Sequence, residues 1–154
     1  MPETHETLVF HVHAHLDVFV DGRPVQVPAG IGINIADPAV HTAGEGAGRT
    51  YGGISTPCRQ ACISPLHTHD TTGILHTESA SATPNTLGQF FTEWGVTLSA
   101  SCVQDHCGGA AVYVDGKRLS RDPATVQLLD HEEIAVVVGQ PPADIPSTAD
   151  FSAA

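Results

Sequence analysis

Three histidines lie close together in the middle of the chain, at His67, His69 and His76. If Thr71 and Thr72 are the two loop residues of a β-hairpin, His67 faces His76 directly, with Cβ atoms about 4.5–5.5 Å apart. His69 shares a strand face with His67, so the three imidazoles can bracket one transition-metal ion. A three-residue loop would instead turn His76 to the other face of the hairpin.

A second set of histidines alternates along the first expected strand, residues 9–20. His11, His13 and His15 share one face of this strand, and the apolar residues between them share the other. If this strand neighbours the hairpin, His13 or His15 completes a site of three or four histidines. The predicted metal ligands are His67, His69, His76, His15 and His13.

A site of histidines, alone or with a carboxylate, suits copper, zinc, iron or nickel better than magnesium or calcium. We expect one transition-metal ion, with copper preferred and iron or zinc as alternatives. Glu78 and Asp70 are the expected catalytic residues, as a base or as a group that orients a ligand. An aspartate that opens a turn explains Asp70 equally well. A solvated histidine face and a metal-free acid–base site remain the alternatives.

The four cysteines form two close sequence pairs, Cys58 with Cys62 and Cys102 with Cys107. Their spacings match neither the C-x-x-C redox motif nor a common zinc knuckle. Disulfides and free or metal-binding thiols are both compatible with the spacing. A site of two histidines and one cysteine would indicate copper.

The composition narrows the range of partners. The 154 residues include 17 acidic and 6 basic side chains, for a net charge of −11, which disfavours binding to nucleic acid or to an anionic membrane. No stretch approaches the roughly 20 apolar residues of a membrane span. We see no signal peptide, so a cytoplasmic location is expected. A small-molecule substrate and a homodimer are both compatible with the sequence.

The expected elements define an α+β domain, mostly β, with a small mixed or antiparallel sheet and one short helix. A hairpin turn at Asp21-Gly22 follows the first strand, and strands are expected at 63–69, 74–79, 111–114 and 133–138. A capping box at Thr86 opens a helix that ends at Gly95. We expect a long loop over 34–61.

A β-grasp-like topology is preferred, because one helix between two strand pairs needs a single sheet to lie on. A small β-barrel or sandwich is the alternative. The expected organisation is a flexible N-terminus over 1–8, a single metal-binding domain over 9–139 and a disordered tail over 140–154.

The strings His13-Ala14-His15-Leu16 and Leu66-His67-Thr68-His69-Asp70, with Gly73-Ile74-Leu75-His76, resemble a small bacterial and archaeal family. The segment 86–95 fits the same family, and the resemblance covers about residues 10–139. It implies a shared histidine site and no particular reaction.

These observations favour a small metal-dependent enzyme with a mononuclear histidine-rich site. Its chemistry would be oxygen activation or Lewis-acid hydrolysis of a small molecule. A carrier or buffer protein for copper or another metal is the alternative, and a purely structural metal is a third interpretation.

Overall fold

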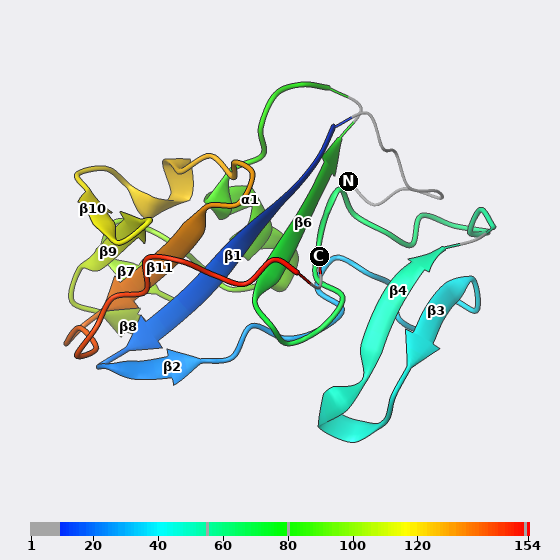
Figure 1. Cartoon of the computed structure of the whole chain (residues 1–154), viewed down its shortest axis with the longest axis horizontal. Coiled ribbons are helices and arrows are strands. Elements are labelled where there is room, and N and C mark those ends of the chain that lie inside the picture. Colours follow the sequence, from blue (N-terminus) through cyan, green and yellow to red (C-terminus); the bar gives the residue numbers. More distant parts are fainter. Residues whose placement is uncertain (1–9, 55, 80, 153) are drawn as a thin grey trace.

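The computed structural model describes residues 10–54, 56–79, 81–152 and 154 (Figure 1). The expected flexible segment 1–8 lies outside the described residues. The elements in chain order are β1 (Phe10–Val20), β2 (Arg23–Val25), β3 (Val40–Ala43), η1 (Gly46–Gly48), β4 (Thr50–Ile54), β5 (Leu66–His67), β6 (Ile74–Ser79), α1 (Leu87–Trp94), β7 (Cys102–Val103), β8 (His106–Cys107), β9 (Ala110–Val114), β10 (Lys117–Leu119), η2 (Pro123–Thr125) and β11 (Glu133–Val138).

One mixed sheet carries most of these strands, in the order β10-β9-β11-β1-β6-β5, with β2 also paired to β1. The long strand β1 is parallel to β11 and antiparallel to β2 and β6. Its two halves therefore have different neighbours, β6 near its start and β2 near its end. The arrangement confirms the expected α+β, mostly-β class. The β9–β10 pair lies beside β11 and the β5–β6 pair lies beside β1, so the parallel strands β1 and β11 have an antiparallel pair on each side. This order agrees with the β-grasp-like topology, and the sheet does not close into a barrel.

Strand β1 has one apolar face and one histidine face, as its alternation predicts. Ala14, Leu16 and Val18 are buried in the main core. Helix α1 covers this apolar face through Leu87, Phe90 and Phe91. The histidines of β1 therefore lie on the opposite face of the sheet from the helix.

The expected helix is confirmed at both ends. Thr86 and Gln89 form the capping box, in which each side chain accepts a hydrogen bond from the other residue's backbone N–H. Gly95 ends the helix in a left-handed conformation, with φ of 75°, which glycine adopts without steric cost.

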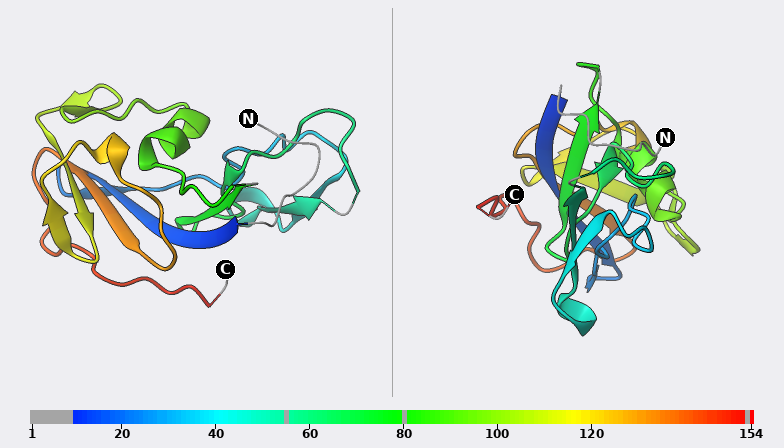
Figure 2. Two further views of the ribbon diagram at one scale, coloured as in Figure 1. Left: turned by 90° about the horizontal axis from the view of Figure 1, so that it is seen from above. Right: turned by 90° about the vertical axis from the view of Figure 1, so that its right-hand side faces the viewer.

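The expectation of an irregular loop over 34–61 is wrong in part. Strands β3 and β4 form a separate two-stranded sheet within it, at one end of the molecule (Figures 1 and 2). A small apolar cluster that includes Ile33, Val40 and Ile63 lies beside it. The two strands are short and rich in glycine and threonine, so they carry little hydrophobic periodicity and the sequence pattern did not reveal them.

We expected the segment after Gln140 to be disordered. Its described residues, 141–152 and 154, form neither helix nor strand, and the segment runs along the sheet. It follows the face opposite α1 (Figure 2). Gln140 N donates to Asp21 Oδ1, and the ring of Phe151 stacks on that of His131 at 4.6 Å between centroids. The segment therefore helps to cover the sheet face that also carries the histidines.

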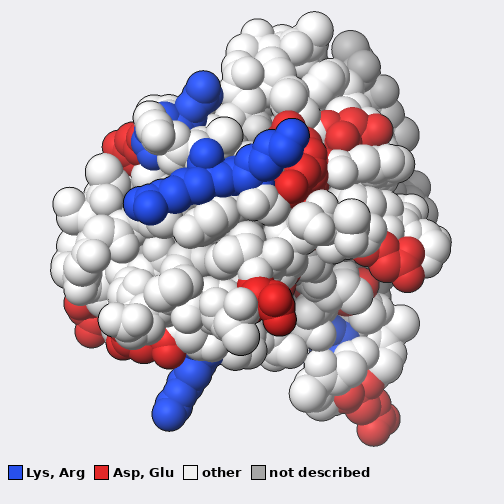
Figure 3. Space-filling model, turned by 60° about the vertical axis from the view of Figure 1, so that its left-hand side comes forward, with Lys and Arg blue, Asp and Glu red and all other residues white. Residues whose placement is uncertain are grey.

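Among the described residues, none of the helices has the length and apolarity needed to cross a bilayer. Figure 3 shows one side of the molecule, where a few basic side chains stand in a largely uncharged surface. With only six lysines and arginines in the chain, this side offers no broad basic surface.

Candidate metal centre

Three histidines from three neighbouring strands lie in register across the sheet. His76 on β6 is paired with His13 on β1 on one side and with His67 on β5 on the other. Directly paired residues of antiparallel strands share a face, so the three imidazoles project to the same side. The predicted facing of His67 and His76 is confirmed. The sheet thus brings the two sequence-distant histidine motifs together.

His67 is a fully buried member of this row, with none of its surface exposed. Its Nδ1 lies 2.9 Å from the carbonyl oxygen of Ser64, and a carbonyl only accepts, so Nδ1 carries the proton and donates. Its Nε2 then has a free lone pair, and this buried atom has no hydrogen-bond partner among the described residues. Burial, followed by the charge of neighbouring His69, lowers the pKa of His67 to about 3. The ring is therefore neutral at pH 7, the form that binds metals.

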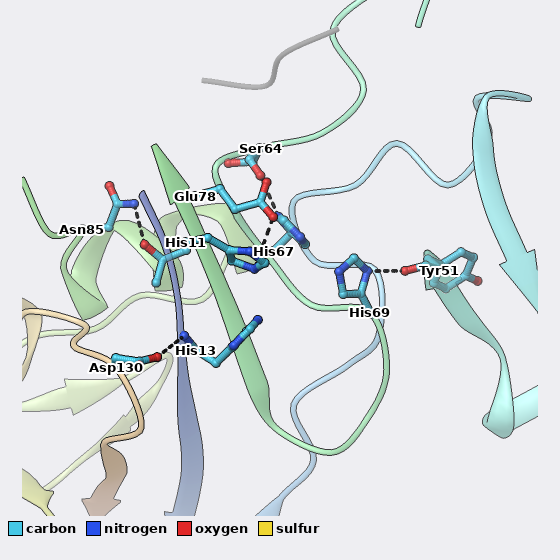
Figure 4. A network of polar contacts seen from close by, with 10 residues as sticks. His11, His13, Tyr51, Ser64, His67, His69, Glu78, Asn85 and Asp130 are labelled. Atoms are coloured by element: carbon cyan, nitrogen blue, oxygen red, sulfur yellow. Dashed lines mark hydrogen bonds and ion pairs between the residues drawn. The ribbon is translucent and has the colours of Figure 1, made fainter. Parts of the chain in front are cut away.

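His69 joins the site from the turn after β5 and is held by the long segment 34–61. Its Nδ1 donates to the carbonyl of Tyr51 on β4, and the Tyr51 N–H donates back to the His69 carbonyl at 2.8 Å (Figure 4). A backbone carbonyl that holds one ring nitrogen is the usual support of a metal-binding histidine. The segment 34–61 therefore positions a candidate ligand.

His76 lies at the centre of the cluster and is 9% exposed. Its ring centroid is 4.2 Å from that of His69, 4.5 Å from that of His13 and 5.3 Å from that of His67. Its Nδ1 is buried, and no described residue forms a hydrogen bond with it. Burial, followed by the charges of His69 and His67, lowers the pKa of His76 to about 2.

Two overlapping triads use this central histidine. One is the buried triad, His67, His69 and His76, and the other is the rim triad, His11, His13 and His76. In each, one ligand atom per residue lies within 4.8 Å of the others. Ligands 2.0–2.2 Å from one ion lie within roughly 4.4 Å of each other, so small ring rotations suffice in either triad.

The rim triad is the more open of the two. The side chain of His11 is 36% exposed, and its Nε2 lies 3.4 Å from Glu78 Oε1. Burial, followed by the charge of His11, lowers the pKa of His13. Our predicted ligands omitted His11, although its alternation with His13 was the signal that could have included it.

Glu78 and Asp70, the predicted catalytic residues, have different surroundings. Glu78 is 6% exposed and lies beside His11 at the edge of the cluster. Asp70 Oδ1 accepts from the Thr72 N–H at 2.9 Å and from the Thr72 hydroxyl. The contacts of Asp70 are those of a residue that opens a turn.

His15, also a predicted ligand, lies outside both triads. Its Nε2 donates to the carbonyl of Thr72 at 2.7 Å, and its Nδ1 lies 2.7 Å from Glu133 Oε2. The parallel pairing of β1 with β11 places His15 opposite Glu133, and no sequence motif indicated this partner. Burial raises the pKa of Glu133 to about 7. Burial lowers the pKa of His15, but hydrogen bonding and the charge of Glu133 outweigh it and leave that pKa raised.

All four cysteines are paired in disulfides, Cys58–Cys62 and Cys102–Cys107. The question that the sequence left open is thereby answered, and a site of two histidines and one thiolate is excluded in this oxidised form. The donor set of the candidate centre is made of neutral imidazoles, which fit copper, zinc, iron or nickel.

Comparison of the chain with protein-family models, with curated proteins and with solved structures finds no match. The functional argument therefore rests on the geometry of the histidine cluster.

Proposed function

We propose that this protein binds one transition-metal ion through His67, His69 and His76, and that it is a small metal-dependent enzyme. The observation that carries the proposal is the buried Nε2 of His67. This atom has a free lone pair and no hydrogen-bond partner in the described part of the chain, and the proton of the ring is fixed on the opposite nitrogen. Burying an unpaired polar atom costs free energy, roughly 1–3 kcal/mol, unless something binds it. A metal ion at the buried triad would remove this cost.

Three protein ligands are typical of catalytic rather than structural zinc sites, because a position remains open for water or substrate. When bound, such an ion acts as a Lewis acid and lowers the pKa of a bound water. The chain's own residues contribute orientation. Ser64 and Tyr51 fix the rings of His67 and His69 through their carbonyls. Glu78, at the edge of the cluster, is the carboxylate best placed to take a proton.

Copper is the preferred ion, with zinc and iron as alternatives. Neutral imidazoles suit all three, and copper(II) binds nitrogen donors most tightly of the divalent first-row ions. His13 lies in register with His76 but groups with His11 in the rim triad, so the buried triad keeps three nitrogen donors.

A metal carrier is the second candidate function, and the rim triad favours it. His11 is partly exposed and shares His76 with the buried triad. Two overlapping sites of different exposure would let an ion enter at the rim and move inward without leaving the protein.

Exogenous azide separates the two functions. We expect protein loaded with one equivalent of Cu²⁺ to bind azide, seen as a new charge-transfer absorption, because an enzyme site keeps an open position. Absence of azide binding, together with complete transfer of the copper to a chelator within seconds, would support the carrier instead.

We also infer that the protein works in an oxidising compartment. Two disulfides in one small domain are typical of exported proteins and rare in the cytoplasm. This inference replaces the cytoplasmic location expected from the sequence. Alkylation of thiols in freshly lysed native cells tests it: no modified cysteine is expected, and four modified cysteines would contradict it.

A further inference from the structure

A second group of candidate ligands lies on the same sheet face, one step along β1 from the histidine cluster. His15 and Asp17 alternate on β1, and Glu133 lies opposite His15 on the parallel strand β11. One ligand atom from each residue lies within 4.8 Å of the others. The group therefore combines one imidazole with two carboxylates.

The charges of this group are not balanced. Glu133 is 1% exposed, and its Oε1 has no hydrogen-bond partner among the described residues. His15 Nδ1 lies 2.7 Å from Glu133 Oε2 and 3.8 Å from Asp17 Oδ2. Because Nε2 carries the proton that is donated to Thr72, Nδ1 of the neutral ring faces the two carboxylates with a lone pair. Two carboxylates so close together and largely removed from water repel each other unless a cation or a proton lies between them.

We propose that His15, Asp17 and Glu133 bind a second divalent cation, of the class that accepts mixed nitrogen and oxygen ligands, such as Mn²⁺ or Zn²⁺. Carboxylates favour Mn²⁺, and zinc sites accept histidine together with aspartate or glutamate. The histidine cluster lacks this carboxylate-rich donor set. The two sites therefore differ in the metals that they prefer.

The support around His15 resembles that of a metal-binding histidine. Its Nε2 donates to the Thr72 carbonyl, which leaves Nδ1 directed at the two carboxylates. Gly73 permits this approach, since a Cβ at its position would lie 2.9 Å from His15 Nε2 and 2.8 Å from the Leu16 carbonyl oxygen. With φ of +88°, position 73 also disfavours other residues.

The site has a path to solvent through Asp17. This side chain is 33% exposed and lines a cavity of about 300 Å³ together with Thr71, Thr72 and Gly73. A hydrated cation can therefore reach the carboxylates without the histidine cluster opening.

Titration of a His67→Ala, His76→Ala double variant with Mn²⁺, followed by the electron paramagnetic resonance of the free ion, tests the proposal. His76 belongs to both histidine triads, so this background removes the buried triad and the rim triad together. We expect one Mn²⁺ per chain to bind and Zn²⁺ to displace it. Adding Asp17→Asn or Glu133→Gln should weaken binding by at least about tenfold. Adding Asp105→Asn, an exposed carboxylate on the β7–β8 hairpin, should change nothing.

Absence of saturable Mn²⁺ and Zn²⁺ binding in the double variant would overturn the second site. So would binding that survives both Asp17→Asn and Glu133→Gln. Neither result would affect the buried triad, which is measured by copper bound to the wild-type chain. Because Asp17 is only partly buried, Asp17→Asn should keep the wild-type circular dichroism spectrum, and a folded variant that still binds Mn²⁺ would count against the proposal even if Glu133→Gln unfolds.

Discussion

His67 and His76 face each other across the β5–β6 ladder, with their ring planes 11° apart and their centroids separated by 5.3 Å. Both rings are buried, and burial lowers the pKa of each, to about 3 and about 2 respectively. Two neutral imidazoles held this way form a ligand pair that exists before any metal arrives. Preorganisation of this kind increases affinity, because little conformational entropy remains to be lost on binding.

The lowered pKa values of His67 and His76 predict a pH-dependent stability of the metal-free protein. Below about pH 6.5 the unfolded chain protonates these rings and the folded chain does not, so stability falls as the pH drops from 7 to 5. We expect wild type to lose about 2 kcal/mol more than His67→Gln over this range. Urea unfolding in a chelator measures it, with His106→Gln as an exposed control. Equal pH dependence of wild type and His67→Gln would contradict the buried, neutral assignment.

The raised pKa of Glu133 predicts a pH dependence of stability opposite in sign to that of the two histidines. Burial raises its pKa to about 7, so the folded protein holds a proton that the unfolded chain releases above about pH 4.5. The stabilisation is complete at low pH and is lost as the pH rises through about 7. We expect wild type, relative to Glu133→Gln, to lose about 2 kcal/mol between pH 5 and pH 8 in a chelator. A constant difference between the two proteins would show that Glu133 does not titrate in this range.

The capping box at Thr86 offers a test that separates stability from metal binding. Thr86→Ala removes a side chain that accepts a hydrogen bond from Gln89 N at the start of α1. The expected cost is about 1 kcal/mol of unfolding free energy. Since α1 covers the face opposite the histidines, the copper content of Thr86→Ala should equal that of wild type. Loss of copper in this variant would mean that metal binding follows global stability rather than the histidine cluster.

The Cys58–Cys62 disulfide lies shortly before β5, the strand that carries His67. Cys62 is 1% exposed, and its carbonyl accepts a hydrogen bond from Asn34 N at 2.7 Å. We expect the Cys58→Ala, Cys62→Ala variant to lose about 2 kcal/mol of stability, as for a short disulfide loop. Copper should also dissociate faster, because without the disulfide the segment that leads from Cys62 into β5 no longer holds His67 as firmly. Stopped-flow transfer to a chelator measures this rate, and an unchanged rate would show that the disulfide does not support the site.

The sequence predicted those helices and strands whose patterns involve residues close to one another in the chain. The alternation of β1, the capping box of α1 and the facing of His67 with His76 all follow from period and turn chemistry. Contacts between distant segments were not predictable in the same way. Nothing in the sequence near His15 indicates that β11 brings Glu133 beside it, because strand order is set by the packing of the whole sheet.

The segment 34–61 is a second case in which the sequence did not predict a contact between distant residues. Its hydrophobic pattern is weak, yet Tyr51 within it supplies the carbonyl that holds His69. A backbone partner has no side-chain signature, so the support of a ligand histidine is invisible in the sequence. The site could therefore be predicted as far as its ligand types, and the carbonyl partners that fix each ring could not.

Copper content measured by mass spectrometry on chelator-stripped, reconstituted protein tests the central claim most directly. The proteins compared are wild type, the His67→Ala, His69→Ala double variant and His106→Ala as an exposed histidine control. We expect about one copper per chain to be retained against a chelator in wild type and in His106→Ala. We expect none to be retained in the double variant, in which only the more open rim triad remains. Equal copper in all three proteins, or none in wild type after reconstitution, would contradict the buried triad as a metal centre.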